Sequence, residues 1–197
     1  MIYNFFAYLS RMRYIERWSL MRNTLPENIQ EHSHAVAVIA HALGIIRRDI
    51  LGIPCDPEEY AAVALYHDCS EILTGDLPTP IKYYSPEIMD AYKQVEELAC
   101  NKLLDTLPEE MRNAFEPMLT GETQARCHDL VKAADKLSAY IKCIEERKAG
   151  NDDFISAEKQ TRRALEESGL PEVDYFMENF IPAFEKTLDE LGTIEER

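Results

Sequence analysis

The sequence predicts an all-α fold, and three kinds of observation support this. Only seven glycines occur in 197 residues, and no alternation of apolar and polar residues persists between turn signals, as a sheet would require. Apolar residues instead recur at the three- and four-residue intervals that place them on one face of a helix. Capping patterns, in which Thr, Asn or Asp is followed three residues later by Glu, stand ahead of the apolar stretches.

The first two predicted helices lie in the N-terminal quarter of the chain. The first carries an apolar stripe formed by Phe5, Phe6, Leu9, Met12 and Ile15. The second begins where two capping-box patterns follow one another, TLPE at 24–27 and NIQE at 28–31, and it runs to about Asp49. Gly52 and Pro54 end it.

A DPEE motif at 56–59 opens the third helix, with proline early and acids in the first turn, and we expect this helix to end near Leu73. The segment TGDLPTP at 74–80 is expected to be a rigid loop, because Pro78 and Pro80 restrict the residues before them to extended geometry.

The remaining periodicity predicts further helices over residues 85–106, 108–117, 122–149, 152–168 and 172–192. Pro182 falls inside the last of these and should kink it. Because no repeat, low-complexity tract or linker interrupts the pattern, we expect residues 1–197 to form a single domain.

Composition and charge limit the partners of the chain. Hydrophobic residues make up 46% and charged residues 29%, which is typical of a soluble globular protein. Lys and Arg number 21 and Asp and Glu 36, a formal net charge of −15. Such a surface repels a nucleic-acid polymer, whereas a small phosphorylated ligand is still compatible with it if a local Arg or metal reverses the field.

The lack of a recognisable targeting signal and the pattern of cysteines predict a cytoplasmic protein. The start, MIYNFFAYLSRMRY, has no basic leader before an apolar core, and the longest apolar run, AVAVIAHALGII, is too short to span a bilayer. The five cysteines are scattered and form no C-x-x-C pair, so we expect reduced thiols rather than disulfides.

A candidate metal site is indicated by His67 and Asp68, which end the apolar stretch AAVALYHD, with Glu71 close behind. His32 upstream and Asp135 downstream complete a set of two imidazoles and two carboxylates, which suits a divalent transition metal. If the helix continues, Glu71 shares a face with His67 and is placed to handle a proton. Water and a phosphate oxygen would fill the free coordination positions, so the set favours a metal-dependent phosphohydrolase.

Each motif also has a plainer interpretation. A lone His–Asp pair is most often a hydrogen bond on a helix surface, and here the apolar surroundings and Glu71 favour a metal. Arg17 offers a planar fork for phosphate and Trp18 a large steric wall, yet taken alone they read as a surface charge and a core residue. The other histidines are expected to face another helix or solvent: His34, His41 and His128.

Taken together, these residues resemble the HD-domain metal-dependent phosphohydrolases, whose signature is H…HD…D. Within that superfamily the chain is most similar to the bacterial 5′-deoxynucleotidases of the YfbR type. The segments that carry the resemblance are FFAYLSR, RWSLMRN, EHS, YHDCSEILTGDLPTPIKYY, KAADKLSAYIKCIEE and DYFMENFIPAFEKTLDE. They spread over nearly the whole chain, and the long middle block is far more specific than a bare HD pair.

The resemblance implies an HD-domain helical bundle, a homodimer, and hydrolysis of deoxyribonucleoside 5′-monophosphates to deoxyribonucleosides and phosphate. It implies one divalent metal, typically cobalt or manganese, bound by His32, His67, Asp68 and Asp135. Glu71 would be the catalytic carboxylate, with Asp76 as the less favoured proton carrier, and Arg17 would orient the phosphate. Trp18 would help to exclude the ribose 2′-hydroxyl. The residues implied to contact the nucleotide are Arg17, Trp18, His32, Asp68, Asp76, Leu77, Pro78, Thr79 and Asp135.

Two positions depart from the familiar pattern, and three other functions stay open. Cys69 follows the HD pair where alanine is more usual, which would bring a soft, oxidisable thiol near the metal, and His34 follows the first ligand. Another HD activity, such as a cyclic-nucleotide phosphodiesterase or a nucleoside triphosphohydrolase, would use the same ligands. A nucleotide-binding regulator without catalysis and a helical adaptor with a structural metal are the remaining alternatives.

Overall fold

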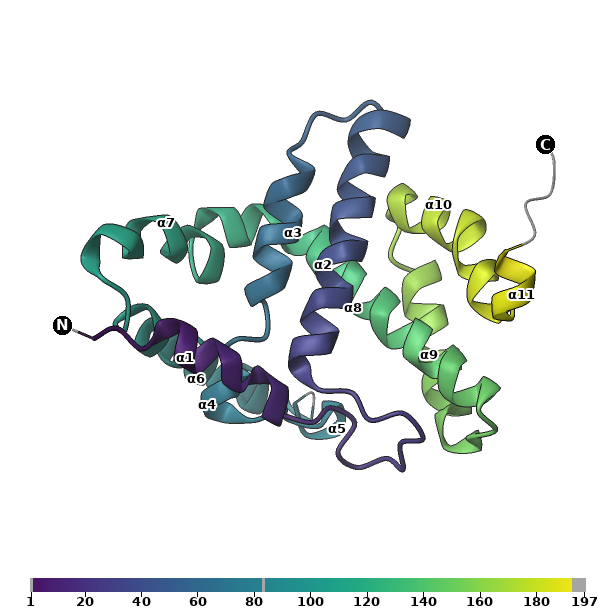
Figure 1. The fold of residues 1–197 in the computed structure, drawn as a ribbon, viewed down its shortest axis with the longest axis horizontal. Helices are drawn as coiled ribbons and strands as arrows, with labels where there is room; N and C mark the ends of the chain where they lie inside the picture. The colour runs from purple at the N-terminus through teal and green to yellow at the C-terminus, as the bar shows by residue number, and fades with distance from the viewer. Residues whose placement is uncertain (1, 83, 193–197) are drawn as a thin grey trace.

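Three helices form the centre of the protein, seen here in a computed structural model that describes residues 2–82 and 84–192. They are α2 (Ile29–Ile45), α3 (Pro57–Tyr66) and α8 (Glu122–Lys148). α2 and α3 lie side by side, and α8 crosses both of them (Figure 1). The described ranges contain no β-strand, which confirms the all-α prediction.

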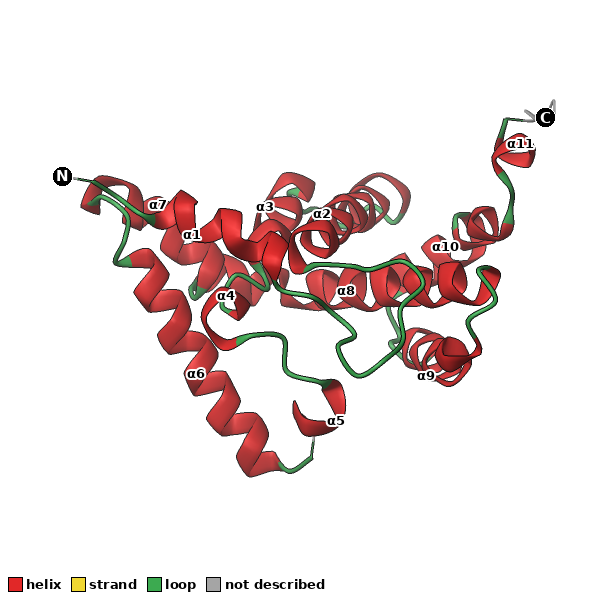
Figure 2. Cartoon of the chain, turned by 60° about the horizontal axis from the view of Figure 1, so that its bottom comes forward, coloured by secondary structure: helices red, strands yellow, loops and turns green. Residues whose placement is uncertain are grey.

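The other elements flank this centre on two sides. On one side are α1 (Phe5–Leu9), a 3-10 helix (Ser10–Tyr14), α4 (Glu71–Thr74), α5 (Thr79–Lys82), α6 (Pro86–Leu104) and α7 (Glu109–Leu119). On the other are α9 (Ile155–Glu166), α10 (Pro171–Asn179) and α11 (Leu188–Leu191), with short 3-10 helices at Asp152–Phe154 and Ile181–Glu185. α6 and α5 reach outward from the rest of the molecule (Figure 2).

Two separate apolar clusters hold these parts together. The larger one lies between α2, α3, α8 and the C-terminal helices and includes the fully buried Leu43, Leu130 and Leu137. The smaller one joins α1, α6 and the end of α3 around Phe5 and Leu104. Each fully buried Leu or Phe side chain contributes about 1.5–3 kcal/mol relative to exposure. Residues next to the predicted metal ligands belong to both clusters: Ala134 to the larger one and Cys69 to the smaller one.

The start of α2 was predicted correctly, but only one of its two capping boxes acts as a cap. The Asn28 side chain accepts hydrogen bonds from the backbone N–H groups of Gln30 and Glu31, at 3.1 and 3.0 Å. The TLPE pattern at 24–27 lies in a loop, because the Thr24 N–H is bonded to a carboxylate of α8 instead. α2 passes at Ile46 into one π-helical turn, Ile46–Ile50, near the predicted end.

The third helix is shorter than predicted, and this places the HD pair in a turn. α3 ends at Tyr66, and α4 begins only at Glu71. The His67 ring nitrogen Nδ1 lies 2.7 Å from the Ala64 carbonyl oxygen, the acceptor that the N–H of Asp68 would use in a continuing α-helix. Residues 67–70 therefore form a turn, and the prediction that His67 and Glu71 share one α-helical face is wrong.

The remaining helices agree with the prediction except at the C-terminal end. The segment predicted as one kinked helix over 172–192 consists of α10, a 3-10 helix and α11, because Pro182 lacks an N–H and ends the α-helical bonding before it. The predicted loop at 74–80 contains the first residues of α5. Within the described ranges, no helix combines the length and the apolar character needed to cross a membrane.

A buried network on α8 fixes the loop that carries Arg17 and Trp18. The carboxylate of Glu146, which is fully buried, accepts hydrogen bonds from the N–H groups of Thr24 and Leu25 at 2.9 and 3.0 Å. Lys142 Nζ donates to the same carboxylate at 2.5 Å. Burial alone would raise the pKa of Glu146, but the Lys142 ammonium and these N–H groups hold that pKa well below its usual range. Glu146 thus ties residues 24–25 to the central helix.

Glu146→Ala is expected to destabilise the protein by about 3–5 kcal/mol, because it leaves the buried Lys142 charge without its partner. Chemical denaturation would measure this loss as a lower midpoint at unchanged slope. The double variant Lys142→Met/Glu146→Met should recover part of the stability, since no charge is then stranded, while the N–H groups of Thr24 and Leu25 still lack an acceptor. A single variant within about 1 kcal/mol of the wild type would contradict the role given to Glu146.

Candidate metal and substrate site

The predicted ligands converge from three elements onto one point. His32 lies in the first turn of α2, His67 and Asp68 lie in the turn after α3, and Asp135 lies on α8. One donor atom each from His32, His67 and Asp135 lies within 4.8 Å of the others, an arrangement that could hold a metal ion. The Asp68 Oδ2 atom is 3.1 Å from His67 Nε2 and 3.6 Å from His32 Nε2. The structure therefore brings together all of the predicted ligands.

One ring nitrogen each of His32 and His67 faces this point and could bind a metal after losing its proton. His67 Nδ1 lies 2.7 Å from the Ala64 carbonyl and donates to it, so Nε2 is the nitrogen that faces the candidate metal site. The Nε2 atoms of His32 and His67 are buried and have no hydrogen-bond partner, although His32 Nε2 is 3.0 Å from Asp135 Oδ1. In the metal-free protein, protons separate these nitrogens from the carboxylate oxygens, and a bound cation would take their place. A divalent cation fits this donor set.

The charges in the site also favour a cation. Burial alone would lower the pKa of His67, but the neighbouring carboxylate of Asp68 raises it to about 9. Burial alone would raise the pKa of Asp68, and the His67 ring lowers it below its ordinary range. Asp135 behaves in the same way, with His32 as the group that lowers its pKa. Both carboxylates are thus ionised at neutral pH, as metal ligands must be.

Arg17 lies beside this donor set. Its Nη1 atom donates a hydrogen bond to Glu27 Oε2 at 2.9 Å and lies 2.5 Å from His32 Nδ1, while Nη2 is 3.7 Å from Asp135 Oδ1. Ser138 Oγ also lies near His32, 3.2 Å from Nδ1. The guanidinium is mostly buried and lies at the edge of the candidate metal site, where it could donate to a substrate phosphate.

Glu71 and Asp76 add two acidic groups at the start and just after the end of α4. Glu71 is buried, and its Oε2 atom has no hydrogen-bond partner. Burial, together with the negative charges of Asp68 and Asp76, raises the pKa of Glu71 to about 9. Burial also raises the pKa of Asp76, although Arg17 opposes that shift. A carboxyl group that holds its proton at neutral pH is suited to proton transfer.

For the other residues predicted to contact the nucleotide, the described part of the structure gives a position but no contact with the metal-site donors. Trp18 is half-buried, and its ring centre lies 5.2 Å from that of Phe154. Leu77 and Pro78 lie in the loop after α4 and are partly exposed. Thr79 begins α5, but its side chain lies outside the described part of the structure.

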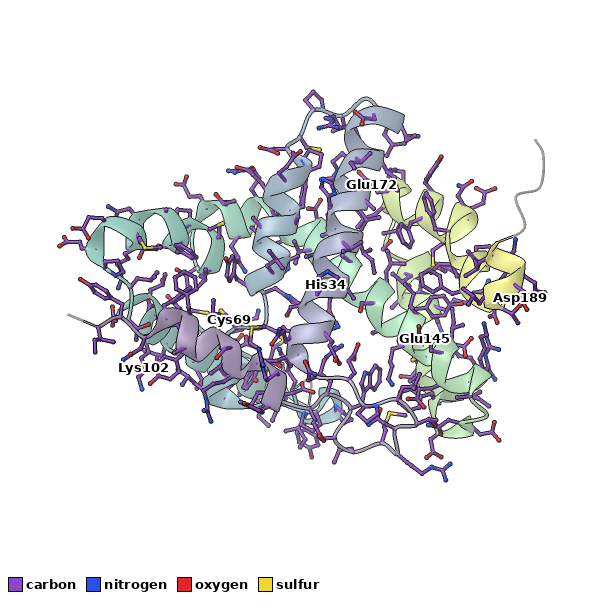
Figure 3. All side chains as sticks on the ribbon, viewed as in Figure 1. His34, Cys69, Lys102, Glu145, Glu172 and Asp189 are labelled. Atoms are coloured by element: carbon purple, nitrogen blue, oxygen red, sulfur yellow. The ribbon has the colours of Figure 1, made fainter. Side chains whose placement is uncertain are left out.

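The remaining histidines and Cys69 are not among the grouped donor atoms. His34 is exposed on α2 (Figure 3), His128 is exposed on α8, and His41 is partly buried, so none of them joins His32 in the site. Cys69 is fully buried in the smaller apolar cluster with Cys100 and Leu103. The expectation that Cys69 would bring a soft ligand near the metal is therefore not supported by its packing.

The fold and the convergent His and Asp donors define the class of the protein as the HD-domain phosphohydrolases. An HD-domain phosphohydrolase from Listeria innocua has the same fold, with a TM-score of 0.79 at 24% identity over 92% of this chain and 88% of that chain. A second solved structure, the cyanophage S-2L HD phosphohydrolase DatZ bound to dA and one catalytic Zn²⁺, matches with a TM-score of 0.63 at 25% identity, over 92% of this chain and 96% of that chain.

Within this class the chain belongs to the YfbR-like family, whose model, described as 5′-deoxynucleotidase YfbR-like, matches residues 4–184. A 5′-deoxynucleotidase of Vibrio parahaemolyticus is 49% identical over 190 residues, covering 96% of this chain and 98% of that protein. The 5′-deoxynucleotidase YfbR of Escherichia coli is 47% identical and covers 96% of each chain. These findings confirm the family resemblance drawn from the sequence.

Proposed function

We propose that this protein is a metal-dependent 5′-deoxynucleotidase that hydrolyses deoxyribonucleoside 5′-monophosphates to deoxyribonucleosides and phosphate. The observation that carries the proposal is the position of Arg17 beside the buried His and Asp donors, with the Trp18 ring against Arg17. The names of the curated relatives and the dA and Zn²⁺ in the cyanophage neighbour support it. No second function is favoured by a specific contact.

His32, His67, Asp68 and Asp135 would hold the metal, for which we propose cobalt or manganese. When bound, the metal supplies Lewis acidity that activates water and offsets the charge of the phosphate. Arg17 would bind the other phosphate oxygens and fix the in-line geometry of attack. Glu71, or less favourably Asp76, would carry the proton to the leaving 5′-oxygen. Trp18 and the loop residues Leu77, Pro78 and Thr79 would contact the nucleoside.

The assembly and location of the protein are also proposals. The family resemblance suggests a homodimer of one-domain chains. The described structure has five free cysteines, in agreement with the reduced thiols expected of a cytoplasmic protein. Sedimentation of the purified protein would distinguish a dimer from a monomer.

The test of the proposed function is phosphate release from paired nucleotides, dAMP beside AMP and dTMP beside UMP. Metal-stripped protein would be compared with the same protein after cobalt or manganese is restored. We expect release that depends on the metal and favours the deoxy member of each pair. Absence of release from every monophosphate by protein that still binds metal would overturn the proposal and direct attention to cyclic nucleotides or triphosphates.

Trp18→Ala is expected to reduce the preference for deoxynucleotides by about tenfold or more, because the indole is the proposed barrier to the 2′-hydroxyl. Trp18 has a φ of +59°, and alanine is strained there to a similar degree, so the substitution mainly removes the ring. The ratio of kcat/KM for dAMP and AMP measures the effect, and Trp18→Phe, which keeps a ring, serves as the control. An unaltered ratio would place the selectivity elsewhere.

A further inference from the structure

Glu27 joins the two side chains to which the proposed function assigns phosphate binding and sugar selection. Its Oε2 atom accepts a hydrogen bond from Arg17 Nη1 at 2.9 Å and another from the indole N–H of Trp18 at 3.1 Å. The Glu27 side chain is only 15% exposed. Because one oxygen atom receives both donors, the guanidinium and the indole are held in a fixed relation to each other.

The backbone strengthens this connection. The Arg17 N–H donates to the Glu27 carbonyl at 2.9 Å, next to an isolated β-bridge between Glu16 and Asn28. The two segments of the loop are thus tied together by both the backbone and the side chain of Glu27. Asn28 in turn caps α2, the helix that carries His32, so the Arg17–Trp18 pair is fixed relative to the start of that helix.

Trp18 needs such support because its backbone is strained. Its φ of +59° is the only positive value among the described non-glycine residues, and bulky side chains rarely adopt this conformation. Strained residues of this kind persist only where surrounding contacts hold them. The Met21 N–H donates to the Trp18 carbonyl at 2.9 Å, and the Glu27 carboxylate holds the other end of the residue through the indole N–H.

Arg17 also has a carboxylate of the metal site within reach. Its Nη2 atom is 3.7 Å from Asp135, and Nη1 lies against His32. Without Glu27, the guanidinium would lose a strong acceptor and be drawn towards the carboxylates of the metal site. The bond to Glu27 therefore keeps Arg17 at the edge of that site, where its remaining N–H donors would be available to a substrate phosphate.

We infer that Glu27 is a positioning residue that sets both phosphate orientation and deoxyribose selectivity through its shared bonds to Arg17 and Trp18. This inference rests on the proposed function. No metal ligand or proton carrier is replaced when Glu27 is changed, so its substitution should alter selectivity and KM while metal content stays the same.

The test compares Glu27→Ala and Glu27→Gln with the wild-type holoenzyme. Loss of a hydrogen-bonded carboxylate should lower the kcat/KM ratio of dAMP to AMP by about tenfold in Glu27→Ala. Glu27→Gln keeps one acceptor oxygen but no charge, and should fall between that variant and the wild type. KM for dAMP should rise more than kcat falls, because positioning rather than proton transfer is lost.

A spectroscopic measurement tests the same contact without turnover. Trp18 is the only tryptophan in the sequence, so emission excited at a wavelength that the ten tyrosines do not absorb reports on this side chain alone. Glu27→Ala should make this emission more accessible to acrylamide quenching. Glu31→Gln, an exposed carboxylate on the first turn of α2, is the matched control and should leave emission and the dAMP to AMP ratio unchanged.

The outcomes separate the two proposals. In one outcome the wild-type enzyme prefers deoxynucleotides, while folded, metal-containing Glu27→Ala and Glu27→Gln show the same dAMP to AMP ratio of kcat/KM and the same acrylamide quenching as the wild type. That result would overturn the role of Glu27 and leave the proposed function standing. A wild-type holoenzyme that releases no phosphate from any monophosphate would overturn the proposed function and, with it, this role. A lower dAMP to AMP ratio in Glu27→Ala, together with increased quenching of Trp18, would support both the proposed function and the role of Glu27.

Discussion

Replacing Glu71 by Gln is expected to lower kcat by about 10²–10⁴, while metal content and substrate affinity stay close to wild type. The carboxyl of Glu71 is buried, one of its oxygen atoms has no partner, and its pKa is raised to about 9. Glutamine has nearly the same shape as the protonated carboxyl but can neither release nor accept a proton. Pre-steady-state and steady-state phosphate release on dAMP would measure the effect.

The same substitution has a second consequence, which concerns stability. The ordinary pKa of Glu71 is 4.5, and in the folded metal-free protein it is about 9. Between these pH values the folded protein holds a proton that the unfolded chain has released, so stability falls as the pH rises. Metal-free Glu71→Gln should lack this component and should melt above wild type at alkaline pH. Glu97→Gln, on the exposed surface of α6, is the control for both measurements. Unchanged kcat would remove the catalytic role of Glu71.

Asp68→Ala is expected to lose metal and activity together, with activity falling by about a thousandfold or more, because a bound metal contributes several kcal/mol of charge stabilisation. Asp68 Oδ2 lies within 3.6 Å of the Nε2 atoms of both His32 and His67, so its removal opens the donor set. Metal analysis of the dialysed variant and its dAMP hydrolysis with added cobalt or manganese would measure the two losses.

An NMR titration of the metal-free variant adds an independent measurement. The Asp68 carboxylate raises the pKa of His67 to about 9, so His67 should titrate at lower pH once Asp68 is alanine. Asp90→Ala removes an exposed carboxylate of α6 and should change neither metal content nor the titration. Full activity of metal-depleted wild-type protein, or metal retained by Asp68→Ala at wild-type affinity, would contradict the ligand role.

Local patterns predicted the fold and the candidate ligands because both depend on short-range information. The start of α2 follows from the Asn28 cap, and the order His32, His67–Asp68, Asp135 is readable from residue types alone. The sequence does not reveal how far apart these side chains lie. That information comes from the packing of α2, α3 and α8, which brings the donors of His32, His67 and Asp135 within 4.8 Å.

The errors of prediction arose where a distant contact overrides a local pattern. The TLPE pattern at 24–27 fails as a helix start because the Thr24 N–H is bonded to Glu146, which lies 122 residues further along the chain. The end of α3 was misplaced because the His67 ring uses the carbonyl of Ala64. The role of Glu27 was missed because its place in a capping pattern hid its contact with Arg17 and Trp18.

The turn between α3 and α4 separates two groups of site residues that are held by different helices. The metal ligands belong to the framework of α2, α3 and α8, whereas Glu71 and Asp76 belong to the side of α4, which packs against α6. Mutations that repack α6 would therefore shift Glu71 and the loop after α4 while leaving His32 and Asp135 in place. They would reach the HD turn only through Cys69, which packs with Cys100 and Leu103 of α6. In evolution, such a division lets a lineage exchange substrates by drift in one half while purifying selection preserves the other. Divergence among HD enzymes should accordingly concentrate in α5 and α6, away from the donors and Glu71.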